Sequence, residues 1–159
     1  MRYVLGKIEN TVLEKSGLPK KGKDFIDRLE VEHILPQTPK DKILTIEFKD
    51  KDDYANSVYK LGNVTLIESQ INQAVNKFND LNSNWFELKQ NEYSNSNLTS
   101  TNLLNHNFSI GNNTALNRFK NDSDYIFFNW NKDSIIKRQE ILLDLVFDSW
   151  RVNDKRIDK

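Results

Sequence analysis

The stretch LEVEHILPQTPK (residues 29–40) places a glutamate and a histidine within an apolar run that ends at a proline. Residues 29–35 of this stretch are predicted to form a short β-strand. Proline has no backbone N–H to donate to a sheet, so we expect the strand to end at Pro36. The polar pair Glu32 and His33 interrupts the apolar run. A neighbouring side chain, a metal ion or a substrate must therefore satisfy this pair.

The composition fits one domain of ordinary size and argues against several classes of protein. The chain has 159 residues, of which 23 are basic and 23 are acidic, so a local basic patch is compatible with it but a strongly basic nucleic-acid-binding protein is not. It has no cysteine, which excludes disulfides, thiolate nucleophiles and cysteine-ligated zinc. No apolar run approaches the roughly 20 residues of a membrane helix, and no signal peptide is visible. We therefore expect a soluble, cytoplasmic protein.

Helix and strand patterns continue on both sides of the opening stretch. Upstream, residues 2–16 predict a helix closed by Gly17, and a basic loop follows it. Because this helical pattern begins with the first residues, we expect the chain to be a segment of a longer protein. Downstream the sequence predicts, in chain order, a short strand or apolar loop at 43–48, a helix at 49–60, a strand at 61–68, a helix at 69–81 capped by Ser69, a helix at 84–93, a loop with a short helical turn at 94–117, and a helix at 133–150 capped by Asp133. The charged tail after Arg151 is expected to fray.

Four polar residues fall where two strands and a helix would meet. A β-hairpin packed on the following helix brings together the pair Glu32–His33, Asn63 at the start of the second strand, and Asn72 on the helix. Glutamate and asparagine offer oxygen ligands, which suit a hard ion such as Mg²⁺. A neutral histidine can take a proton from water near pH 7. This set of side chains suits metal-assisted hydrolysis of a phosphodiester bond.

The same residues carry a resemblance to a known family. The segments VEHILPQ, LGNVTLIESQIN, FELKQNEYSNS and WNKDSIIKRQEILLDLVFDSW resemble the C-terminal nuclease domain of GmrSD-type (type IV) restriction proteins, which are HNH, or His-Me finger, nucleases. The resemblance spans nearly the whole chain. It implies an α+β fold, mostly helical overall, in which α-helices surround a ββα-metal core. We accordingly expect a single domain over 1–159, with its core at about 29–80 and a helical C-terminal part at 81–152.

The resemblance also implies roles for individual residues. His33 would be the general base, and Glu32 and Asn72 would bind Mg²⁺ or Mn²⁺, with Glu32 replacing the aspartate of many HNH sites. Asn63 would fix the loop that orients His33, through a backbone hydrogen bond to the imidazole. Three basic residues are candidate DNA contacts: Lys77, Lys89 and Arg138. Without the resemblance, simpler interpretations stay open, since Asn63 suits a turn, Asn72 a solvated helix face, and the cations ordinary surface or packing positions.

These expectations converge on a metal-dependent DNA endonuclease that restricts foreign or modified DNA. The alternative is a catalytically weak module that keeps the nuclease fold and binds DNA or another protein. The expected partners are DNA and a preceding NTPase-like recognition domain, in the same chain or complex, and no membrane. Since the net charge is zero, the segment alone is expected to bind DNA weakly and without sequence preference.

Overall fold

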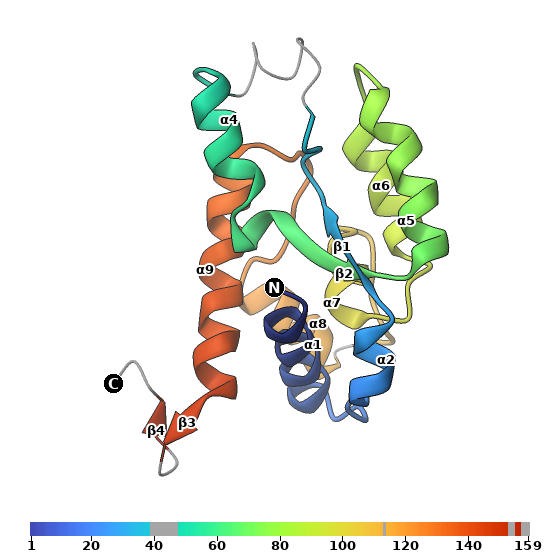
Figure 1. Ribbon diagram of the computed structural model, residues 1–159. Coiled ribbons are helices and arrows are strands. Elements are labelled where there is room, and N and C mark those ends of the chain that lie inside the picture. Colours follow the sequence, from blue (N-terminus) through green and yellow to red (C-terminus); the bar gives the residue numbers. More distant parts are fainter. Residues whose placement is uncertain (39–47, 113, 153–154, 157–159) are drawn as a thin grey trace.

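A computed structural model describes residues 1–38, 48–112, 114–152 and 155–156 of the chain (Figure 1). The helices are α1 (Arg2–Lys15), α2 (Lys23–Asp27), α4 (Lys51–Val58), α5 (Ser69–Asn76), α6 (Trp85–Tyr93), α7 (Thr99–Asn102), α8 (Ala115–Asp122) and α9 (Lys132–Ser149), with 3-10 turns η1 (Leu61–Asn63) and η2 (Lys77–Asp80). The strands are β1 (Glu30–His33), β2 (Val64–Ile67), β3 (Arg151–Val152) and β4 (Lys155–Arg156). The protein is mostly helical with small antiparallel sheets, which agrees with the α+β class.

Strands β1 and β2 form an antiparallel pair at the centre of the molecule. Their register sets Glu30 opposite Ile67 and His33 opposite Val64. Every residue of β2 is buried, because helices cover it. Strand β1 ends at His33, before Pro36, because the next residues bond to Asn63 instead of continuing the ladder. The observed strand is therefore shorter than the strand predicted over 29–35.

Helices lie on both sides of this strand pair (Figure 1). Helix α9, the longest, packs against α1 and against the η1 turn, whereas α5 packs against β1 and α6. Helices α1 and α7 contact β2. Buried apolar side chains from these elements form a continuous core that includes Ile8, Leu66, Val75, Leu98 and Leu142. In the described part of the chain, no helix is both long and apolar enough to cross a bilayer.

The η1 turn meets α9 with almost no space between the two backbones. A Cβ atom added at Gly62 would lie 2.0 Å from the carbonyl oxygen of Ile135. Arg138 of α9, only 1% exposed, donates from Nη1 to the carbonyls of Gly62 and Val64, each at 2.8 Å. Its Nε donates to the hydroxyl of Tyr125 at 2.6 Å. Arg138 thus fixes the turn that leads into β2.

Two predicted helix caps are displaced in the structure. Helix α9 is capped by Asn131, whose side chain accepts the N–H of Ser134 at 3.0 Å, and not by Asp133, which lies in the first turn. Asn131 has the extended backbone that lets a side chain reach back to the helix N–H groups. Ser69 is the first residue of α5, and Glu68 precedes it as the N-cap residue.

Three elements were not predicted by the sequence patterns. Helix α2 forms within the expected basic loop, and α8 begins in the Ser/Asn-rich segment, where Thr114 accepts the N–H of Asn117 as a cap. In the described part of the tail, β3 and β4 form an antiparallel pair. The short helical turn expected in 94–117 is present as α7. Most of the expected strand or loop at 43–48 lies outside the described residues.

Candidate active site

Glu32 is a buried carboxylate that lines a pocket beside β1. It lies on β1 and is 4% exposed. Its Oε1 accepts a hydrogen bond from Lys89 Nζ at 2.7 Å and a longer one, of 3.4 Å, from the hydroxyl of Tyr93. Both donors belong to α6. The polar pair of the opening stretch is therefore satisfied, at its glutamate, by a neighbouring lysine.

His33 is half-buried at the end of β1. Its ring lies edge-on to Tyr59, with the ring centroids 5.8 Å apart. The side-chain amide nitrogen of Gln37 is 3.1 Å from Nδ1 and 3.3 Å from Nε2. Burial lowers the pKa of His33 below its ordinary 6.5; Glu32 opposes this shift, and Lys89 adds to it. The imidazole is consequently neutral at pH 7 and able to accept a proton.

Asn63 clamps the chain just after His33. It is fully buried, and its Oδ1 accepts the backbone N–H of Leu35 at 2.8 Å and the indole N–H of Trp130 at 2.9 Å. Its Nδ2 donates to the carbonyls of Val58 and Leu35, at 2.8 and 3.2 Å. These bonds match the expectation that Asn63 fixes this loop, but its backbone carbonyl accepts the N–H of Ile34 at 2.9 Å. Among the described residues, the ring nitrogens of His33 contact the side-chain amide of Gln37 and not Asn63.

Four consecutive carbonyl groups, beginning with that of His33 at the end of β1, are held by three different elements. Lys89 of α6 donates to the carbonyls of His33 and Ile34, at 3.3 and 3.0 Å. Asn63 donates to the carbonyl of Leu35, and the hydroxyl of Tyr54, on α4, donates to that of Pro36. Burial raises the pKa of Tyr54, so its hydroxyl stays protonated as a donor. The segment that carries His33 is thus fixed before any ligand binds.

The side-chain amide of Asn72, on α5, has its NH₂ group paired and its oxygen without a partner among the described residues. Its Nδ2 donates to Oε2 of Glu30, and this bond is the main cause of a lowered pKa at Glu30, which therefore stays ionised. Because the NH₂ group is fixed at Glu30, the orientation of the amide is determined. The Oδ1 atom is buried and has no hydrogen-bond partner among the described residues. A buried acceptor of this kind requires a donor or a cation.

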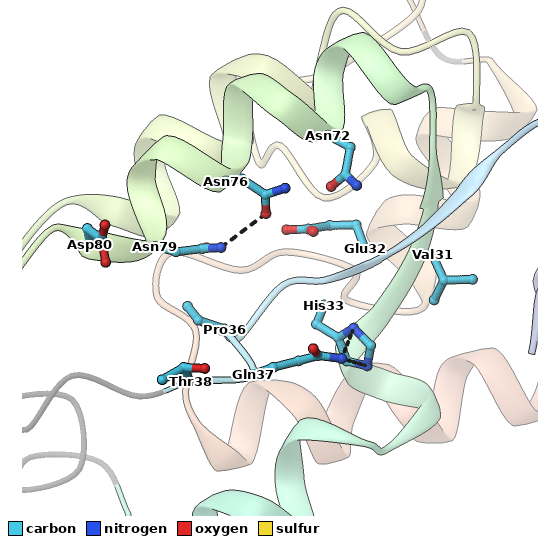
Figure 2. A pocket seen from close by; sticks show the side chains of 10 residues that line it. All are labelled: Val31, Glu32, His33, Pro36, Gln37, Thr38, Asn72, Asn76, Asn79 and Asp80. Carbon is cyan, nitrogen blue, oxygen red and sulfur yellow. Dashed lines mark hydrogen bonds between the residues drawn. The ribbon is translucent and has the colours of Figure 1, made fainter.

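These side chains line one pocket of about 530 Å³ between β1, α5 and η2 (Figure 2). Figure 2 shows Glu32, Asn72 and Asn76 turned into the same space, with His33 and Gln37 on the other side of the strand segment. The remaining lining residues are Val31, Pro36, Thr38, Asn79 and Asp80. The structure thus brings Glu32, His33 and Asn72 to one cavity, with Asn63 behind it.

The donor set of the pocket fits a hard cation. Glu32 Oε2 and Asn72 Oδ1 are oxygen atoms that no hydrogen bond among the described residues uses. Across the described ranges, no group of three or more His, Cys, Asp or Glu side chains is placed to hold a metal ion. An ion at these oxygens would therefore complete its coordination with water or substrate oxygens, as Mg²⁺ commonly does.

Two of the three candidate DNA contacts are buried. Lys89 is 0% exposed and Arg138 is 1% exposed, and both bond to backbone carbonyls next to the site. They are structural cations in this fold, because neither reaches the surface where a phosphate would lie. Lys77, in η2 beside the pocket, is exposed and stays a candidate contact. Arg138 lies three residues after Ile135 and four before Leu142, and Lys89 lies three after Phe86 and four before Tyr93. Both cations therefore share a helix face with buried apolar residues, and this spacing is a signal for their burial.

Several residues that shape the site were missed by sequence reasoning. Tyr54 and Trp130 were not expected at the site, yet they hold Pro36 and Asn63. Glu30 was not expected to fix Asn72. The alternation of β1 gives a partial signal, because Glu30 and Glu32 share one face of the strand.

Comparison with known proteins gives one match. The sequence model of the family described as "GmrSD restriction endonucleases, C-terminal domain" matches residues 1–145. No curated protein and no solved structure matches the chain.

Proposed function

The chain belongs to the family of C-terminal domains of GmrSD restriction endonucleases, and on this premise we propose that the pocket between β1 and α5 is a metal-dependent centre for hydrolysis of DNA. One observation carries the proposal. The unpaired Oδ1 of Asn72 and the carboxylate of Glu32 face one cavity, at whose edge lies a neutral imidazole. Buried acceptors and a proton acceptor are the groups that metal-assisted phosphodiester cleavage requires.

In this proposal His33 is the general base. Its neutral ring accepts the proton of the water molecule that attacks the scissile phosphorus. Glu32 and Asn72 would hold Mg²⁺ or Mn²⁺ through their free oxygens. When bound there, such an ion would supply positive charge that stabilises the phosphate and the leaving 3′ oxygen. Asn63 keeps the His33 segment in place, and Lys77 is the candidate phosphate contact beside the pocket.

The order β1, β2, α5 supports an HNH-type interpretation. In that interpretation the two antiparallel strands and the following helix are a ββα-metal core, and Glu32 takes the place of the usual aspartate. We further propose that the domain restricts foreign or modified DNA, with a preceding NTPase-like domain supplying recognition. Weak intrinsic DNA binding would fit the zero net charge of the chain.

A catalytically weak module that binds DNA or another protein is the second candidate. The observation that favours it is the amide of Gln37, which lies against both ring nitrogens of His33. For catalysis this exposed side chain must turn aside, so that water can reach the ring. In the weak module it would stay in place.

Cleavage of a supercoiled plasmid separates the two candidates. We expect nicking or linearisation with Mg²⁺ or Mn²⁺ and none with a chelator. Glu32→Gln and Asn72→Ala should each lose activity, whereas Asn91→Ala, which alters an exposed asparagine of α6, should not. A parent protein that binds the plasmid but never cleaves it, with either ion, would favour the second candidate.

A further inference from the structure

Lys89 is a buried cation that contacts both halves of the proposed centre. Its side chain is 0% exposed, and a burial of this kind requires full pairing. Its Nζ is 2.7 Å from Glu32 Oε1, 3.0 Å from the carbonyl of Ile34 and 3.3 Å from the carbonyl of His33. An ammonium group has three N–H donors, so these acceptors use all of them.

The contact makes the two oxygens of Glu32 unequal. Oε1 already accepts from Lys89 and, at 3.4 Å, from Tyr93. No hydrogen bond among the described residues uses Oε2. Figure 2 shows the carboxylate extended toward Asn72 and Asn76 of α5. A carboxylate held in this way presents one free oxygen to the pocket.

We propose that Lys89 is a positioning residue that fixes Glu32 by Oε1, so that the carboxylate binds one ion through Oε2 alone, and that it holds the His33 backbone beside it. The inference rests on the proposed function, since it requires Glu32 to be a metal ligand. The inference adds two points to that function. Glu32 binds the ion through one oxygen only, and Lys89 is the residue that controls this mode of binding. Lys89 touches neither the ion nor the DNA.

The absence of cysteine allows a direct test. Lys89→Cys carries the only thiol of the chain, and alkylation with 2-bromoethylamine in denaturant, followed by refolding, restores an ammonium group of nearly the same reach. Mn²⁺ affinity is measured by the loss of the free-ion electron paramagnetic resonance signal. We expect Lys89→Cys to bind Mn²⁺ at least about tenfold more weakly than the parent, and the alkylated protein to recover.

The direction in which Mn²⁺ affinity changes in Lys89→Cys distinguishes a positioning role from a purely electrostatic one. If Lys89 acted only by its charge, its removal would lessen repulsion of the ion, and Mn²⁺ would bind more tightly. Unchanged or tighter binding by Lys89→Cys overturns the proposal. Lys51→Cys, at an exposed lysine of α4 and treated in the same way, is the matched control and should bind Mn²⁺ like the parent.

Glu32→Gln separates failure of this inference from failure of the proposed function. If Glu32→Gln binds Mn²⁺ as well as the parent does, the metal site itself is wrong. If Glu32→Gln loses Mn²⁺ while Lys89→Cys retains it, only the positioning role is wrong.

A measurement on the parent protein covers the case in which Lys89→Cys does not fold. In a crystal soaked with Mn²⁺ we expect the ion on Oε2 of Glu32, with Lys89 Nζ still bonded to Oε1. An ion bound by both oxygens, or a displaced Lys89, contradicts the proposal.

Discussion

At the residue scale, Asn63 is the side chain on which the site most depends. Its amide bonds to four groups of the protein, in Leu35, Val58 and Trp130. Asn63→Ala would leave these buried groups unpaired, at a cost of at least about 3 kcal/mol in the free energy of unfolding. Denaturant unfolding measures the change, with the exposed Asn91→Ala as a control expected to shift stability by less than about 0.5 kcal/mol. Equal stabilities of the two variants would show that the hydrogen bonds of the Asn63 side chain contribute nothing to the free energy of unfolding.

The pKa of His33 predicts how cleavage depends on pH. Burial lowers that pKa, so the ring loses its proton at a lower pH than a free histidine, whose ordinary value is 6.5. Only the unprotonated ring can act as the base, and activity should therefore rise with pH through a midpoint below 6.5. Single-turnover cleavage across the acidic range gives this midpoint. A midpoint at or above the ordinary value would contradict the assignment of a burial-lowered His33 as the base.

The site residues were predictable to different degrees. Glu32, His33, Asn63 and Asn72 were predicted to lie close together from strand, turn and helix signals, and the structure brings Glu32, His33 and Asn72 to one pocket. The hydrogen bond that pairs Glu32 could not be predicted, because its donor is Lys89, which lies far along the chain on α6. Sequence patterns assign a charge to a helix face, but they do not give the depth at which that face packs.

At the element scale, the approach of η1 to α9 tests how tightly the second strand is fixed. Gly62→Ala would place a methyl group against the backbone of α9, which cannot move aside as a side chain can. We expect a loss of roughly 1–3 kcal/mol in unfolding free energy, together with lower cleavage, since Asn63 follows directly. Gly22→Ala is the matched control, because nothing lies within 4 Å of its added Cβ and its φ is −72°. A Gly62→Ala protein as stable as Gly22→Ala would refute this tight packing.

Helices α1, α6 and α9 were predicted close to their observed bounds. Within the Ser/Asn-rich segment the short helical turn was predicted but its bounds were not, because its order comes from distant partners. Helix α7, for example, begins where the carboxylate of Glu9 on α1 accepts the N–H groups of Thr99 and Ser100, at 2.9 and 2.8 Å. Such long-range capping leaves no local pattern.

At the scale of the whole molecule, the fold does not depend on the proposed ion. The core joins apolar side chains of α1, β2, α6 and α9, and Glu32 is already paired with Lys89. Removing divalent ions with a chelator should therefore abolish cleavage but leave the far-ultraviolet circular dichroism spectrum and the melting temperature nearly unchanged. Loss of helical signal on chelation would indicate a structural metal site instead.

The claim that His33 is the base of a DNA-cleaving centre is tested most directly by comparing the two histidines of the chain. His106 lies in another pocket, beside Phe108 and Lys120, and serves as the matched control. In a plasmid-cleavage assay with Mn²⁺, His33→Ala should lower the rate by at least about 100-fold with a melting temperature near that of the parent, and His106→Ala should cleave like the parent. If His33→Ala is folded and cleaves at the parental rate, His33 is not the base and the proposed centre is wrong.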